Sequence, residues 1–168
     1  MALLLVASML APLLFMAAPV SAEPEVMNLV ISGSGSAPWS ISNIAPGDNG
    51  TKFVELKNVG MIDGYVTIWF SDIVKTDGGT DGANLSHYFL LTPISDGRSS
   101  NLSFPVMFDE IPQTSSDRSI CIGPLMAGGS MNLTWVWEFL DNGAPQNDAQ
   151  GDGLSFTINY LMTATGPE

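Results

Sequence analysis

The chain has 168 residues, of which 17 are acidic and 5 are basic, so its net charge is −12. This length fits one domain. The acidic balance excludes DNA or RNA as an expected partner, because phosphate neutralisation needs clustered Lys and Arg side chains. Cys121 is the only cysteine and lies between two isoleucines. No internal disulfide can form, and a buried thiol is expected.

The first 22 residues have the pattern of a secretory signal peptide. Leu3–Leu14 is almost wholly apolar, and Val20-Ser21-Ala22 matches a small-x-Ala cleavage site, which places cleavage before Glu23. Pro12 interrupts the apolar run, and the run is short for a membrane span. We therefore expect secretion to the extracellular space or the cell surface. An uncleaved N-terminal membrane anchor is the alternative.

Behind this segment, short strand patterns alternate with turns rich in Gly, Pro, Asn and Asp. In chain order the expected strands are Val26–Ser32, Trp39–Ile44, Thr51–Lys57, Tyr65–Phe70, Phe89–Ile94, Ser119–Leu125, Ser130–Leu140 and Leu154–Ala164. Gly33–Ser36 is expected to be a flexible breaker. Asn101–Phe108 is a further candidate that Pro105 restricts to a sheet edge. Such strands without long helical periodicity predict an all-β, antiparallel β-sandwich.

The last two strands have the clearest alternation, which predicts their inward faces. The residues expected to face the core are Met131, Leu133, Trp135, Trp137 and Phe139 on one strand and Leu154, Phe156, Ile158, Tyr160 and Met162 on the other. The tryptophans Trp39, Trp69, Trp135 and Trp137 also suggest a sugar-stacking platform, but two of them share this inward face. A core role is therefore the favoured interpretation.

Two stretches carry a resemblance to a known family. Ser42–Gly50 (SNIAPGDNG), followed by Leu56–Gly60 and Gly64-Tyr65, is similar to the N-terminal signature of the TasA/camelysin family of secreted fibre proteins. Asn147–Asp152 and the strand after it resemble the C-terminal signature of the same family. The two signatures also occur in the family's order.

This resemblance implies a jelly-roll-like domain over 37–168 that builds filaments of a biofilm matrix or a bundling pilus from copies of itself. In such relatives each subunit donates its N-terminal strand to the next. Here residues 23–36 would be the strand and its hinge, and the donor residues would be Val26, Met27, Asn28, Leu29, Val30 and Ile31. The alternative is that Val26–Ser32 folds back into its own sheet.

Two polar loops suggest calcium, although no cofactor is required by the filament hypothesis. Their candidate ligands are Asp77 and Asp81 in the first loop and Asp148 and Asp152 in the second. Hard cations take oxygen ligands from such loops. A monomeric, calcium-ordered adhesion module at the cell surface is therefore the alternative function. Ordinary polar turns would explain the same residues.

The sequence gives little support for an enzyme. Some members of the family are labelled metallopeptidases, but this chain has a single histidine, His87, and no HExxH pair of zinc ligands. It also has no Gly-x-Ser-x-Gly nucleophile elbow. We therefore expect no catalytic residue.

Four Asn-x-Ser/Thr sequons mark candidate glycosylation sites. Their asparagines are Asn49, Asn84, Asn101 and Asn132. In a host that modifies such sites, the chain would be a glycoprotein with these asparagines on exposed faces or loops.

Overall fold

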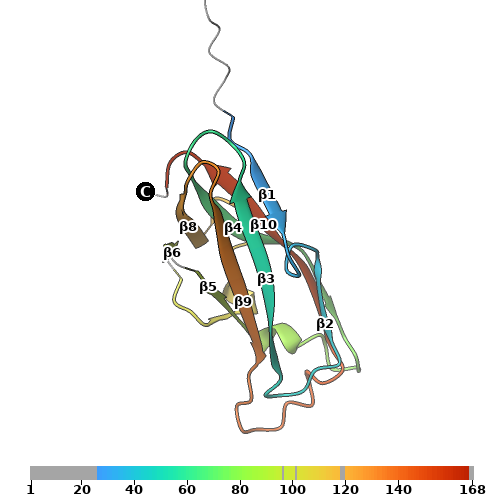
Figure 1. The fold of residues 1–168 in the computed structure, drawn as a ribbon. Helices are drawn as coiled ribbons and strands as arrows, with labels where there is room; N and C mark the ends of the chain where they lie inside the picture. Colours follow the sequence, from blue (N-terminus) through green and yellow to red (C-terminus); the bar gives the residue numbers. More distant parts are fainter. Residues whose placement is uncertain (1–25, 96, 101, 118–119, 167–168) are drawn as a thin grey trace, which may run out of the picture.

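The computed structural model describes residues 26–95, 97–100, 102–117 and 120–166. The expected signal peptide and the sequon asparagine Asn101 lie outside these residues. Two antiparallel five-stranded sheets face each other as a β-sandwich (Figure 1), and the described part of the chain contains no α-helix. The predicted all-β sandwich is confirmed.

The ten strands divide strictly between the two sheets. In spatial order, sheet A holds β1 (Leu29–Ser32), β3 (Asn49–Asn58), β9 (Ser130–Phe139), β5 (Phe89–Ile94) and β7 (Val106–Met107). Sheet B holds β2 (Trp39–Ser42), β10 (Gly153–Thr163), β4 (Gly64–Thr76), β8 (Ile120–Leu125) and β6 (Arg98–Ser100). Successive strands alternate between the sheets, so each connection crosses the sandwich, as in a jelly roll.

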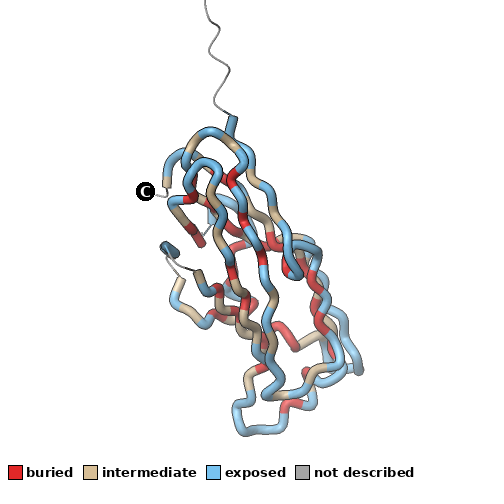
Figure 2. Tube along the Cα trace, viewed as in Figure 1, coloured by how far each residue is buried: buried red, intermediate tan, exposed pale blue. Residues whose placement is uncertain are grey.

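The core lies between the sheets because apolar residues recur at every second position of the long strands. Trp135 and Phe139 on β9 are buried, as is Phe156 on β10. Their rings interlock with those of Phe70 and Trp39: Phe70 meets Trp135 edge-on at 5.6 Å, and Trp39 stacks on Phe156 at 5.2 Å. Figure 2 shows buried positions running along the strands, with exposed loops at both ends. The core interpretation is therefore confirmed for Trp135, whereas Trp137 is half-buried and packs against the core.

The strands differ from the prediction mainly where they leave the core. β4 continues to Thr76, although the sequence pattern ends at Phe70, because its last residues pair with β10; of their apolar side chains, Ile73 packs partly against the core and Val74 is exposed. The candidate Asn101–Phe108 contributes only β7, after Pro105. Two short 3₁₀ turns, η1 (Leu85–His87) and η2 (Phe108–Glu110), complete the described elements.

Candidate functional site: the N-terminal edge strand and its neighbours

The segment expected to be a donor strand forms the edge of sheet A. β1 pairs antiparallel with β3, with Leu29 opposite Asn58 and Ser32 opposite Glu55. The ladder continues beyond the strand, because the Val59 N–H donates to the Asn28 carbonyl at 2.9 Å and the Met61 N–H donates to Val26 at 3.0 Å. Within one chain, this segment therefore folds back onto its own sheet. Its exchange between chains stays a prediction.

β1 is held by backbone hydrogen bonds more than by side-chain burial. Leu29 and Ile31 are half-buried against the core, and Val30 is 46% exposed. β1 has no fully buried residue, and it covers four of the ten residues of β3. Its attachment to the sandwich therefore rests on the hydrogen bonds to β3 and on the partial burial of Leu29 and Ile31.

The expected hinge Gly33–Ser36 is a tight turn fixed to β3 rather than a flexible breaker. The Gly35 N–H donates to the Phe53 carbonyl at 2.8 Å, and the Phe53 N–H donates to the Ser34 hydroxyl at 3.0 Å. Gly33 has φ +100°, and a Cβ there would lie 2.5 Å from the Phe53 oxygen. The glycines are needed for this close approach. A released β1 would therefore swing from the residues just before Gly35.

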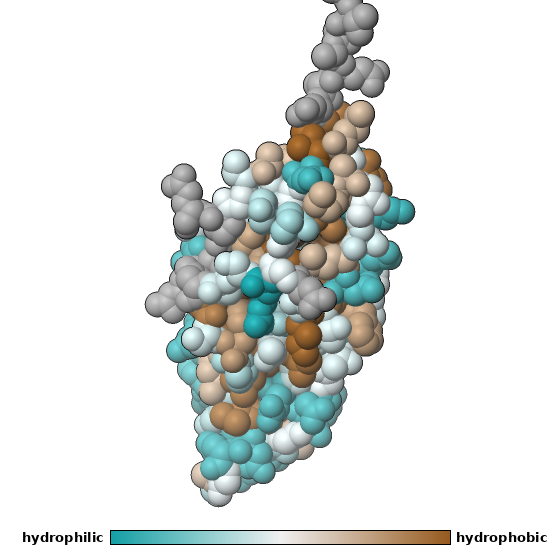
Figure 3. All heavy atoms as spheres, turned by 60° about the vertical axis from the view of Figure 1, so that its left-hand side comes forward, coloured by the Kyte–Doolittle hydropathy of each residue, from teal (hydrophilic) through white to brown (hydrophobic). Residues whose placement is uncertain are grey.

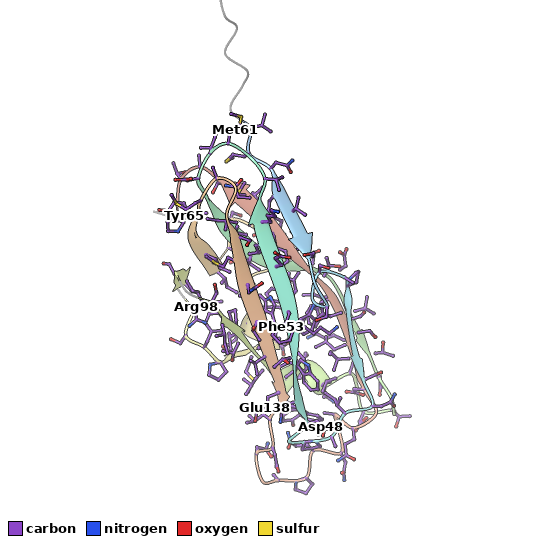
Figure 4. All side chains as sticks on the ribbon, viewed as in Figure 1. Asp48, Phe53, Met61, Tyr65, Arg98 and Glu138 are labelled. Atoms are coloured by element: carbon purple, nitrogen blue, oxygen red, sulfur yellow. The ribbon has the colours of Figure 1, made fainter. Side chains whose placement is uncertain are left out.

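Exposed apolar side chains gather at the end of the sandwich where the chain enters. Val26, Met27, Val59, Met61 and Met126 are 38–75% exposed. Figure 3 shows apolar atoms at this end, and Figure 4 places Met61 at its tip. An exposed apolar cluster of this kind is typical of an interaction surface.

A buried amide frames this apolar end. Asn58 is fully buried, and its Nδ2 donates to the carbonyls of Ile62 at 2.7 Å and Leu125 at 3.1 Å. Its Oδ1 accepts the Gly60 N–H at 3.0 Å. One side chain therefore joins the β3–β4 loop to the β8–β9 hairpin beneath the apolar cluster.

The two loops proposed for calcium meet at Asp152. This aspartate is 2% exposed, and its oxygens accept the N–H groups of Gly78 at 2.9 Å and Asn84 at 2.6 Å. The Leu85 N–H adds a third bond at 3.1 Å. The Asp152 carboxylate thus holds the backbone of the first loop by hydrogen bonds. The sequence pattern did not reveal this structural role.

The other proposed ligands also bind groups of the protein. Asp77 accepts the N–H groups of Gly79 and Gly82, Asp148 accepts the Tyr88 hydroxyl at 3.1 Å, and Asp81 is exposed. Among the described residues, no three His, Cys, Asp or Glu side chains are grouped to hold a metal ion. Calcium binding stays a prediction.

His87 lies in η1, where it pairs with Asp109 of η2. The His87 Nδ1 is 3.0 Å from Asp109 Oδ2, and the Lys75 Nζ is 2.7 Å from Asp109 Oδ1. A groove of about 650 Å³ adjoins Asp109 and is lined further by Glu110, Ile111, Pro112, Gln113, Thr114 and Asp117. Within the described ranges, no histidine, cysteine or serine lines this groove, so it offers no Ser–His or Cys–His pair of the kind nucleophilic catalysis uses.

The Asp109 pairings give a prediction for acid stability. Burial by itself raises the pKa of Asp109, but the Lys75 hydrogen bond and the charges of Lys75 and His87 outweigh burial and lower it below 3.8. The unfolded chain therefore binds this proton more tightly. The stabilisation is present above pH 3.8 and is lost as the pH falls through the lower folded pKa.

Replacing Asp109 by Asn should lower the free energy of unfolding near neutral pH by about 0.5–1 kcal/mol, the range of a part-exposed ion pair. The difference from the parent chain should vanish in acid, as urea titrations at a series of pH values will measure. A difference that persists unchanged below the folded pKa would show that Asp109 acts through packing.

Comparison with known proteins gives no relative: no protein-family model matches the chain, and no curated protein is significantly similar to it. In the part of the chain that the structure describes, no helix has the length and apolar character needed to cross a bilayer.

Proposed function

We propose that the mature chain is a secreted structural subunit that polymerises by exchanging β1 between neighbouring copies. The product is an extracellular filament of a biofilm matrix or a bundling pilus. The observation that carries the proposal is β1 itself. It closes the edge of the ten-residue strand β3, follows directly after the segment expected to be removed, and has no fully buried residue.

The exchange needs no new type of contact. A copy of Val26–Ser32 from a neighbouring chain presents the same N–H and C=O groups to β3, so the hydrogen bonds lost within one chain reform between two. What changes is the connectivity. Each chain gives one strand and accepts one, and a head-to-tail contact that does not close into a ring grows into a fibre.

The end of the sandwich supports the same arrangement. The apolar residues around Val26 and Met61 flank the point where a donated strand would enter or leave. In a fibre, the preceding subunit would cover them. Two chains of net charge −12 repel each other, so an apolar contact of this kind is the surface most suited to bring them together.

The test is electron microscopy of the purified chain that starts at Glu23, after separation into monomers and return to native buffer. We expect unbranched filaments whose amount rises above a critical protein concentration. Static light scattering of the same samples should show growth of mass with time. Monodisperse monomers at every concentration, with no filament in the micrographs, would overturn the proposal.

A further inference from the structure

Two of the four sequons lie on strands that present both key residues to solvent. Asn49 and Thr51 belong to β3, and Asn132 and Thr134 belong to β9. Residues two apart on a strand point to the same side. The alternate positions, such as Val54 and Leu133, are buried in the core. Both asparagines and both threonines are therefore on the outer face of sheet A, and both asparagines are exposed.

In the third sequon, the Asn84 amide is hydrogen-bonded within the fold and Ser86 is buried. The Asn84 Nδ2 donates to the carbonyls of Asp81 at 3.1 Å, Gly82 at 3.0 Å and Asp148 at 3.3 Å, and Ser86 is 1% exposed. A glycosylated amide nitrogen keeps a single N–H. A glycan on Asn84 would thus break most of these bonds and separate the two loops.

The outer face of sheet A also exposes apolar side chains beside Asn132. Phe53 and Ile94 are 57% and 56% exposed and are the cross-strand partners of Thr134 on its two sides. Asn132 is their diagonal neighbour on the same face. Figure 4 shows Phe53 near the middle of β3, with Glu138 toward the end opposite Met61. Both side chains thus leave apolar surface in contact with solvent on this face.

We propose that Asn49 and Asn132 carry N-linked glycans and that the glycan on Asn132 covers Phe53 and Ile94. In the reaction, Asn Nδ2 bonds to the anomeric carbon of a lipid-linked oligosaccharide diphosphate. The anomeric C–O bond breaks, the lipid diphosphate leaves with the electron pair, and the amide loses a proton. The attached sugar then lays the apolar face of its ring over the phenyl ring of Phe53 and the sec-butyl side chain of Ile94. This proposal requires secretion but does not depend on strand exchange.

The test is peptide mapping by mass spectrometry of the chain secreted by its native host. We expect glycan mass on the peptides that contain Asn49 and Asn132 and none on Asn84. Each of the variants N49Q and N132Q, made in that host, should lose one glycan, and N84Q should lose none. Unmodified Asn49 and Asn132, or a glycan on Asn84, would overturn the assignment.

A matched pair of variants tests the covering of the apolar face. Thr134→Ser keeps the sequon, so the chain should keep the glycan on Asn132. Thr134→Val keeps Asn132 but destroys the sequon, so the chain should lose this glycan. The loss should increase the fluorescence of a dye that binds apolar surface, and adding Phe53→Ser should reverse that increase. Equal dye binding with and without the glycan would contradict the covering. Dimers that form through Phe53 in the glycosylated chain would instead make this face an interface between copies.

Discussion

Deleting Glu23–Ser32 from the mature chain should abolish filament formation and leave monomers. The deletion removes the segment proposed to fill the edge of β3 in a neighbouring copy, so each chain becomes an acceptor without a donor. The inward core residues, including Trp135 and Phe156, belong to other strands. The truncated chain should therefore stay folded, as circular dichroism will show, while electron microscopy shows no fibres.

A single substitution in β1 should also impair filament formation. Ile31 is half-buried against the core, so Ile31→Asp places a carboxylate where a donated strand must pack. The penalty should raise the critical concentration for assembly about tenfold or more, since about 1.4 kcal/mol corresponds to a factor of ten. Val30→Ser is the matched control, because Val30 points outward.

Filaments of normal length from the deletion variant would show that β1 is not the joining element.

The second large effect should come from Asp152. Replacing it by Ala removes the acceptor of three backbone N–H groups in a nearly solvent-free position. We expect the free energy of unfolding to fall by about 3 kcal/mol or more, because each buried N–H group left without a partner costs about 1–3 kcal/mol. Urea denaturation will measure it. Asp152→Asn keeps one acceptor oxygen, and its free energy of unfolding should fall by about 2 kcal/mol.

Asp81 supplies the control for this experiment, because it lies in the loop that Asp152 holds but is exposed. Asp81→Asn should change stability by no more than about 0.5 kcal/mol. The calcium hypothesis predicts a different result. Calcium would raise the melting temperature of the parent chain but would not raise that of either variant. Equal losses for Asp81→Asn and Asp152→Asn would contradict the structural role of Asp152.

The sequence predicts the fold well where one physical pattern dominates. β9 and β10 alternate between large apolar residues and mostly polar ones. The residues expected inside are buried, except that Met131, Trp137 and Tyr160 are half-buried against the core. The same reasoning ends β4 too early, because its second half is held mainly by backbone pairing with β10, and only Ile73 among its apolar side chains packs partly against the core. Alternation detects burial, and it cannot detect pairing without burial.

The features of the candidate site depend on contacts between distant segments, which a local pattern does not encode. The sequence pattern predicts a flexible stretch at Gly33–Ser36, but the Phe53 carbonyl approaches Gly33 and Gly35 closely and leaves no room for a side chain. The pattern predicts a calcium ligand at Asp152, yet this side chain is buried and accepts N–H groups from residues 78–85. No local signal could reveal this role, because the N–H groups that Asp152 accepts belong to Gly78, Asn84 and Leu85, far away along the chain.

Disulfide trapping between two different chains tests strand exchange most directly. Val30 and Lys57 are opposite each other in the β1–β3 register, and both are exposed. One chain would carry Val30→Cys and the other Lys57→Cys, mixed as monomers and oxidised during assembly. Cys121 should not compete, because it is buried and burial raises the pKa of its thiol. Thr51→Cys, farther along the same face of β3, gives the mismatched control.

Strand exchange predicts a disulfide between the Val30→Cys chain and the Lys57→Cys chain, in large excess over the pair with Thr51→Cys. A single chain that carries both Val30→Cys and Lys57→Cys serves as the double variant. As a monomer it should cross-link internally, which reports the unexchanged fold. If the double variant cross-links internally but the mixed chains form no more disulfide than the mismatched pair, β1 stays in its own sheet and the account is contradicted.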